Sequence, residues 1–266
     1  MLHRKPTLDD GSAVITGLLL GMNLPSNLPV GIVILGAVVA IGIGKMTFGG
    51  LGCNLFNPAL VGRCMLLVSF PVQMTSWPVV GQQMSYTDAT TGATPLSLMK
   101  KAISSGDASV LDSMPSSLHL LLGNNVNGGA GTIGEVCALA LLLGLAFMLW
   151  KKIITWHIPV SIILSAFVFA SVLHIANPIY ADPISVVLTG GMMLGAIFMA
   201  TDYTTSPMTR RGQLIYGTAI GLLTIVIRNW GAYPEGMSFA ILIMNAFTPL
   251  INNYCKPKRF GEVLKK

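Results

Sequence analysis

Long apolar runs alternate with short polar segments along most of the chain. A helix needs about 20 apolar residues to cross a bilayer, and most of the runs approach that length. The first run, which Pro25 ends, is shorter and predicts a half-helix. The pattern therefore predicts an all-α membrane protein, a polytopic helix bundle. Its eight candidate runs are 12–24, 29–45, 48–70, 133–150, 153–173, 184–200, 214–230 and 237–254.

Composition and charge support this class and exclude others. Of the 266 residues, 53% are hydrophobic and only 10% charged, with a mean hydropathy of +0.70, whereas about a quarter of a soluble domain is charged. The net charge of +6 comes from short basic clusters between apolar runs, so no nucleic-acid partner is expected. If residue 1 is cytoplasmic and each run crosses once, most lysines and arginines fall inside the cell.

That orientation predicts four parts. Residues 1–70 form a first group of membrane helices, 71–131 a polar periplasmic loop, 132–255 a second group, and 256–266 a basic cytoplasmic tail. The four cysteines are far apart and are expected to be packing residues. The chain has no P-loop, dinucleotide fingerprint, serine triad or metal-ligand cluster. We expect no catalytic residues and no metal site in this chain.

Three short strings recur in the same order and predict an internal repeat. Gly17–Gly21 matches Gly191–Gly195, Asn54-x-Phe56-x-Pro58 matches Asn245-x-Phe247-x-Pro249, and residues 10–17 echo 182–190. With five helices in a complete copy, the two copies must be inverted. Two helices precede the matched part in the second copy only. We therefore expect a truncated first repeat, with two helices upstream of residue 1.

One polar string carries candidate chemistry. By composition, Asp88-Ala89-Thr90-Thr91-Gly92-Ala93-Thr94-Pro95-Leu96 is an ordinary turn-rich loop. As an ordered string, however, Asp-x-x-Thr-Gly-Ala-Thr resembles the flavinylation motif of subunits that carry FMN in a phosphoester to the last threonine. The resemblance implies covalent FMN on Thr94, with Asp88, Thr91, Gly92 and Ala93 completing the cofactor-binding motif. A small Gly-Ala pair lets a transferase approach the backbone.

The repeated proline motifs and a buried charge suggest a second site. Asn54, Phe56, Asn245 and Phe247 offer amides and aromatic rings beside prolines that interrupt apolar runs, as a coupled-ion or inner-flavin site would require. Arg63 falls inside a run, where an ionisable group is functional by default and needs a phosphate or carboxylate partner. The alternative is that these prolines only kink packed helices.

Four other charged residues have simpler interpretations. Arg228 and Lys45 lie near run ends and are expected to snorkel to the interface. Glu135 is either a functional residue or a carboxylate that stabilises a helix N-terminus. Asp202 is either a cation ligand or a solvated boundary residue.

Longer strings carry a family resemblance. Residues 56–63, 200–209 and 227–240 resemble the D subunits of the Rnf electron-transport complex. The resemblance implies a urea-transporter-like fold in the bacterial inner membrane, covalent FMN, and a second non-covalent flavin such as riboflavin. It also implies electron transfer coupled to Na⁺ or H⁺ translocation. The partners would be membrane lipid and the other Rnf subunits, which handle ferredoxin and NAD and include a second FMN carrier.

Two alternatives remain at this point. One is the related B subunit of the sodium-translocating NADH:quinone reductase, a longer chain with the same threonine motif. The other is a cofactor-free solute channel or carrier built from inverted repeats, which has no use for the motif at Thr94. Family members begin with membrane helices that this sequence lacks.

Overall fold

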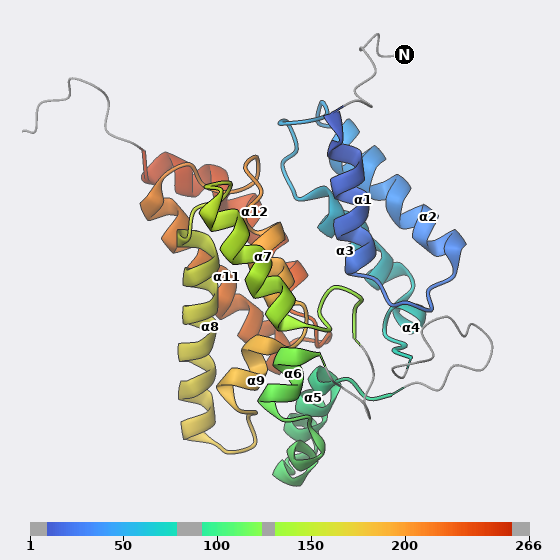
Figure 1. Cartoon of the computed structure of the whole chain (residues 1–266), viewed down its shortest axis with the longest axis vertical. Helices are drawn as coiled ribbons and strands as arrows, with labels where there is room; N and C mark the ends of the chain where they lie inside the picture. Colours follow the sequence, from blue (N-terminus) through green and yellow to red (C-terminus); the bar gives the residue numbers. More distant parts are fainter. Residues whose placement is uncertain (1–9, 79–91, 124–130, 257–266) are drawn as a thin grey trace, which may run out of the picture.

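A computed structural model describes residues 10–78, 92–123 and 131–256. Every regular element in these ranges is helical, which confirms the predicted all-α class (Figure 1). The helices are α1 (Ser12–Met22), α2 (Val30–Val38), α3 (Pro58–Ser69), α4 (Pro71–Met74), α5 (Pro95–Ser105), α6 (Ser117–Leu122), α7 (Ala138–Trp150), α8 (His157–Ala176), α9 (Pro183–Leu188), α10 (Met192–Leu194), α11 (Arg210–Trp230) and α12 (Met237–Tyr254), with π-helices η2 (Val39–Met46) and η4 (Gly195–Met199) and the 3-10 helix η3 (Ala108–Ser113).

The first three helices pack closely because small residues line their contacts. η2 continues α2 directly, so the run 29–45 forms one helical segment as predicted. A Cβ on Gly44 would lie 3.0 Å from the Cα of Pro58, and one on Gly62 would lie 2.8 Å from the carbonyl oxygen of Gly36. Such close backbone approach is typical of helices packed in membranes.

The second group is built around α8 and α11. A Cβ on Gly217 would lie 1.8 Å from Oγ of Ser161, and one on Gly221 would lie 2.0 Å from Oγ of Ser165. Glycine at these two positions therefore permits the close α8–α11 packing. Figure 1 shows α1 to α3 on one side of the molecule, with α7, α8, α11 and α12 on the other.

Within the described residues one helix, His157–Ala176, is both long and apolar enough to cross a membrane by itself. Shorter apolar helices cover Ser12–Met22, Val30–Met46, Pro58–Ser69 and Ala138–Trp150. Large apolar side chains of α8 remain exposed, as expected of a surface that faces lipid. They include Val160, Leu164, Phe167, Val168 and Val172.

Two predicted continuous helices are broken. The run 48–70 is helical only from Pro58, because Asn57 caps α3 with its side-chain oxygen and Pro58 is the first helical residue. Pro58 therefore starts a helix instead of kinking one. The run 184–200 divides into α9, α10 and η4, because Gly190 and Gly191 have φ values of +71° and +63°. Pro249 does lie inside α12, as predicted.

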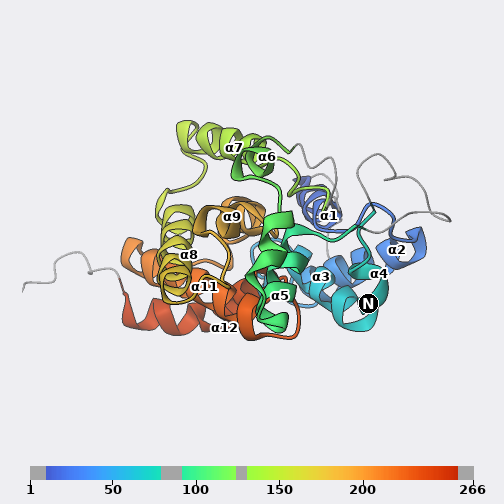
Figure 2. The same cartoon turned by 90° about the horizontal axis from the view of Figure 1, so that it is seen from below.

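The polar segment 71–131 contains helices as well as loops. α5, η3 and α6 lie together at the end of the molecule opposite the start of α1 (Figure 1). Seen from that end, α5 lies between α3 and α8 (Figure 2). Leu96, Met99 and Ala181 form a small core that fixes this region against the second helix group.

Candidate functional site

Thr94 occupies the N-cap of α5. Its hydroxyl oxygen accepts the backbone N–H of Ser97 (3.2 Å), and the Ser97 hydroxyl donates to the Thr94 carbonyl (2.7 Å). Pro95 follows as the first helical residue, where its missing N–H costs nothing. The start of α5 thus has a sequence-encoded cap, and its first turn carries the partial positive charge of a helix N-terminus.

Thr94 also lines a cavity of about 510 Å³, here called the Thr94 cavity. This volume is within the range of about 300–1,000 Å³ that suits small-molecule and cofactor sites. Trp77 and Tyr233 supply aromatic walls, and Glu235 supplies a carboxylate. Tyr233 stacks on Phe239, with centroids 6.0 Å apart and an 18° angle between rings. The cavity can hold a planar aromatic group beside a hydroxyl.

The rest of the threonine motif is only partly visible. Asp88 and Thr91 lie outside the described residues. The backbone N–H of Gly92 donates to the carbonyl of Trp77 (3.0 Å), and both Gly92 and Ala93 line the Thr94 cavity. The described half of the motif therefore borders the cavity that Thr94 faces.

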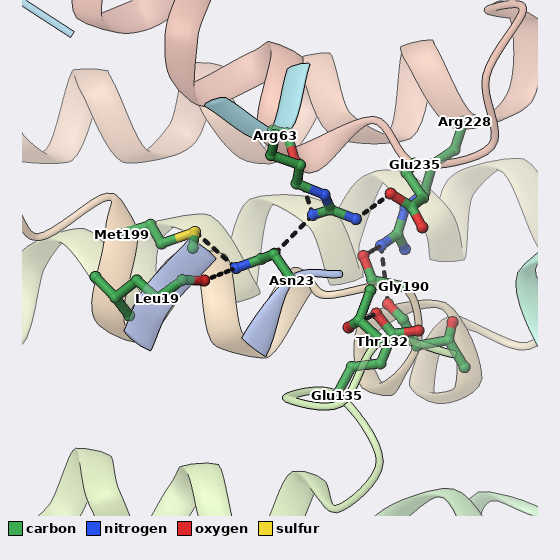
Figure 3. A network of polar contacts seen from close by, with 11 residues as sticks. Leu19, Asn23, Arg63, Thr132, Glu135, Gly190, Met199, Arg228 and Glu235 are labelled. Carbon is green, nitrogen blue, oxygen red and sulfur yellow. Dashed lines mark hydrogen bonds and ion pairs between the residues drawn. The ribbon is translucent and has the colours of Figure 1, made fainter. Parts of the chain in front are cut away.

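Arg63 is buried, and its two terminal nitrogens have partners from three segments (Figure 3). Nη1 donates to Asn23 Oδ1 (2.7 Å) and to Ser238 Oγ (2.9 Å), and Nη2 pairs with the carboxylate of Glu235. The expectation that a phosphate or carboxylate pairs with Arg63 is met by Glu235, which also lines the Thr94 cavity. This pair joins α3 to the segment that precedes α12.

The snorkelling interpretation of Arg228 is wrong. Its side chain is buried, and its guanidinium donates to the carbonyls of Val186 (2.7 Å), Thr189 (2.8 Å) and Gly190 (2.8 Å). Arg228 thereby satisfies the carbonyls that the break between α9 and α10 leaves without helical partners. The sequence did not reveal this role because the break itself was not recognised.

The interpretation of Glu135 as a helix-start residue is also wrong. α7 begins at Ala138 with Cys137 as its N-cap and has no acidic residue in its first turn. The Glu135 carboxylate instead accepts from the Thr132 hydroxyl (2.9 Å), close to Gly190 (Figure 3). Lys45 is buried and donates to Ser12 Oγ, so it is not free at the interface either.

A second cavity, of about 500 Å³, lies near the start of α3 and is here called the Asn54 cavity. Asn54, Asn57 and Asp202 line it together with apolar side chains of α1. Asn54 Nδ2 donates to Asp202 Oδ2 (3.3 Å), and the hydroxyls of Thr204 and Thr205 donate to the same oxygen (3.1 and 3.3 Å). Asp202 thus forms a polar cluster on the cavity wall.

The other predicted residues of the second site lie elsewhere. Asn245 is fully buried, with its amide 2.6 Å from the Tyr216 hydroxyl and oriented to accept the backbone N–H of Asn57 (3.1 Å). Phe247 is half exposed on α12, and Phe56 does not line the Asn54 cavity. The structure therefore brings Asn54 to a cavity and connects Asn245 to it through Asn57.

Sequence reasoning missed three residues. Glu235, Asn23 and Asn57 each lie beside a residue that was noticed, but none forms a motif by itself. Asn57 had a readable signal, because Asn followed by Pro at the start of an apolar run predicts a capped helix start. Glu235 lies in the string 227–240 that carries the family resemblance.

The sequence is similar to known proteins along most of its length. The model of the NQR2, RnfD, RnfE family matches residues 1–261. The chain belongs to this family. It is 47% identical, over 98% of its length and 76% of the relative's, to the D subunit of the Na(+)-translocating ferredoxin:NAD(+) oxidoreductase complex of Acetobacterium woodii.

Two further relatives carry related names. The chain is 42% identical to the D subunit of the proton-translocating ferredoxin:NAD(+) oxidoreductase complex of Clostridium ljungdahlii, over 98% of this chain and 78% of that one. It is 40% identical to the D subunit of the ion-translocating oxidoreductase complex of Klebsiella pneumoniae, over 98% and 81%. Membership of this family, the apolar composition and the exposed apolar helices identify the chain as a membrane protein.

Proposed function

We propose that this chain is the D-type membrane subunit of an Rnf ion-translocating oxidoreductase and relays electrons through FMN esterified to Thr94. The observation that supports this proposal most strongly is that Thr94 both caps α5 and lines the Thr94 cavity of about 510 Å³. A cofactor-free channel or carrier, the other class considered, has no need of a capped hydroxyl beside an aromatic-walled cavity.

The residues present fit a flavin phosphoester. An ester on Thr94 Oγ1 places a phosphate at the N-terminus of an 11-residue helix, where the helix dipole favours negative charge. Trp77 and Tyr233 offer apolar surfaces for a ring system. When bound, FMN supplies the capacity to accept and donate electrons, which none of the protein side chains lining the cavity provides. The protein itself binds, orients and shields the group.

The experiment compares three variants of the complex expressed with its transferase. Thr94→Asn removes the hydroxyl but retains a side chain that caps a helix well, so covalent flavin should vanish while the subunit still assembles. Thr94→Ser retains the hydroxyl and should keep label, and Thr91→Ala should leave some attachment. The fluorescence of the subunit band in a denaturing gel under ultraviolet light measures the covalent flavin of all three variants. Full label in Thr94→Asn contradicts the assignment.

We also propose a second, non-covalent flavin such as riboflavin in the Asn54 cavity. Its support is a volume of about 500 Å³ with largely apolar walls and a polar end made by Asn54 and Asp202. A hydrocarbon core of about 30 Å is long for one electron-transfer step, so an intermediate cofactor near the opposite end of α3 shortens the route. Asn54→Leu should lower the flavin released by denaturation without changing the Thr94 label. Unchanged release contradicts this proposal.

The remaining assignments follow from the family and are part of the same proposal. The chain would work in a bacterial inner membrane with other subunits of the complex, including a second FMN carrier, and would couple electron transfer to Na⁺ or H⁺ movement. The names of the Acetobacterium woodii and Clostridium ljungdahlii relatives specify Na⁺ and protons respectively. Ferredoxin and NAD chemistry would belong to the partner subunits.

We further propose the inverted repeat and the urea-transporter-like fold. Two matched hydrogen bonds support the repeat: Thr16 donates to the carbonyl of Ser12 (3.0 Å), and Thr189 donates to the carbonyl of Ser185 (2.8 Å). These helix starts lie at opposite ends of the molecule (Figure 1).

Inversion predicts opposite accessibility of the two helix starts. Cysteines introduced as Asp10→Cys and Asp182→Cys should react with a membrane-impermeant thiol reagent from opposite sides of the membrane. Asp182 should be reached from the periplasmic side, where the Thr94 cavity would also open. Labelling of both from one side contradicts the inverted arrangement.

A further inference from the structure

The two large cavities lie along a single face of α3. Ala59, near the start of the helix, lines the Asn54 cavity, and Leu67, near its end, lines the Thr94 cavity. Residues four apart share one face of an α-helix, so Ala59, Arg63 and Leu67 form one row. Arg63 therefore lies about 6 Å along the axis from each of the other two.

α1 shows the same arrangement, because its residues line the Asn54 cavity and the residue that follows its end contacts Arg63. Leu18 and Leu19 line the Asn54 cavity. Asn23 follows the end of α1, donates to the carbonyl of Leu19 (2.8 Å) and accepts from Arg63 (2.7 Å). Arg63 and Asn23 are respectively 3% and 2% exposed, so they form a buried layer between the residues that line the two cavities.

The chemistry of this layer is that of an occupied cation site. Asn23 Oδ1 and the Glu235 carboxylate converge on the guanidinium of Arg63 (Figure 3). Ser238 Oγ also accepts from this guanidinium. Amide, hydroxyl and carboxylate oxygens are also the ligands that a hard metal cation requires. Arg63 uses these acceptors, and its guanidinium, which has only donors, offers a cation no replacement ligand.

We propose that Arg63 is a built-in cation that seals the passage between the Thr94 cavity and the Asn54 cavity against Na⁺ and protons. Positive groups in membrane pores exclude cations and protons electrostatically, and a guanidinium has donors but no acceptor with which to take up a proton and pass it on. The two cavities lie toward opposite ends of α3. With the seal in place, the protein can hold cofactors in both cavities while ions do not flow through them down their gradient. The seal does not depend on Thr94 carrying a flavin.

The test uses the purified complex in liposomes without any electron donor. A K⁺ diffusion potential drives passive cation entry, and enclosed pH- and Na⁺-sensitive dyes report it. Wild-type complex should be tight. Arg63→Ser leaves Glu235, Asn23 and Ser238 without their cation, and Na⁺ or proton entry should become roughly tenfold faster. Arg63→Lys retains a positive charge and should remain tight.

Two further variants keep the result interpretable. Arg63→Ser combined with Glu235→Gln avoids an unpaired buried carboxylate, so it protects assembly, and it should also leak. Arg228→Ser removes an equally buried arginine that donates to the backbone carbonyls at the α9–α10 break and not to Asn23, Ser238 or Glu235, and it should stay tight. The proposal is overturned if both assembled variants that carry Arg63→Ser give tight liposomes, or if the Arg228 variant leaks equally. A rapid leak through the wild-type complex also overturns it.

Discussion

The two copies of Asn-x-Phe-x-Pro have the same residues and different structures. In the first, the motif ends at the start of α3, with Asn57 as cap and Pro58 as the first helical residue. In the second, Asn245 and Pro249 both lie within α12. In the first copy, asparagine before proline is a good helix start. In the second copy the residue before proline is Thr248, whose hydroxyl donates to the carbonyls of Thr205 (2.8 Å) and Met244 (3.1 Å) and so does not cap a new helix at Pro249.

This difference separates cavity-lining roles from structural ones. Asn54 lies on a cavity wall, while Asn245 is fully buried and joins α12 to the start of α3 through Asn57. Equal sequence motifs therefore do not predict equal functions. The following substitutions sharpen the comparison.

The largest effect on stability is expected from Asn245→Leu. The change leaves the Tyr216 hydroxyl and the Asn57 N–H without a partner in a buried position. Each unsatisfied buried polar group costs about 1–3 kcal/mol, so the midpoint of thermal unfolding in detergent should fall clearly. An Asn245→Leu protein as stable as wild type would mean that these bonds contribute nothing.

A smaller loss is expected from Asn57→Ala. The side chain accepts the N–H of Ala59 (3.1 Å) and donates to the carbonyl of Met199 (3.1 Å). Loss of an N-cap costs about 0.5–2 kcal/mol. Asn57→Ser, which retains a capping oxygen, should recover part of the loss in the same unfolding experiment, and failure to recover any would exclude capping as the cause.

The smallest effect on stability is expected from Asn54→Leu. Asn54 is buried beside a cavity, and its amide donates to the Phe56 carbonyl and the Asp202 carboxylate. A typical intramolecular hydrogen bond contributes about 0.5–1.5 kcal/mol, so unfolding should shift less than in the other two variants while bound flavin falls. A loss of stability as large as that of Asn245→Leu would remove the distinction between the two copies.

Sequence patterns predicted the helical class and most helix positions because apolar runs must form helices in a membrane. Runs 214–230 and 237–254 correspond closely to α11 and α12. The breaks inside 48–70 and 184–200 were missed, because apolarity continues through them. The asparagine before Pro58 marks the start of a helix, and the Gly190-Gly191 pair marks an interruption.

The candidate sites were predicted unevenly for the same reason. Thr94 was found through an ordered motif, and Arg63 through its charge within an apolar run. Their partners are distant in sequence: Glu235 reaches Arg63 from the segment before α12, and Asp202 reaches Asn54 across 148 positions. Such contacts depend on tertiary packing, which no local pattern reports.

The central claim concerns one covalent bond and can be measured by mass spectrometry. Trypsin cleaves after Arg63 and Lys100, which releases residues 64–100 as a single peptide that contains Thr94. In complex from cells with the transferase, this peptide should carry the mass of FMN less one water, and fragment ions should place it on Thr94. The same peptide from Thr94→Asn should be unmodified. An unmodified wild-type peptide, or a flavin on another threonine, would contradict the account.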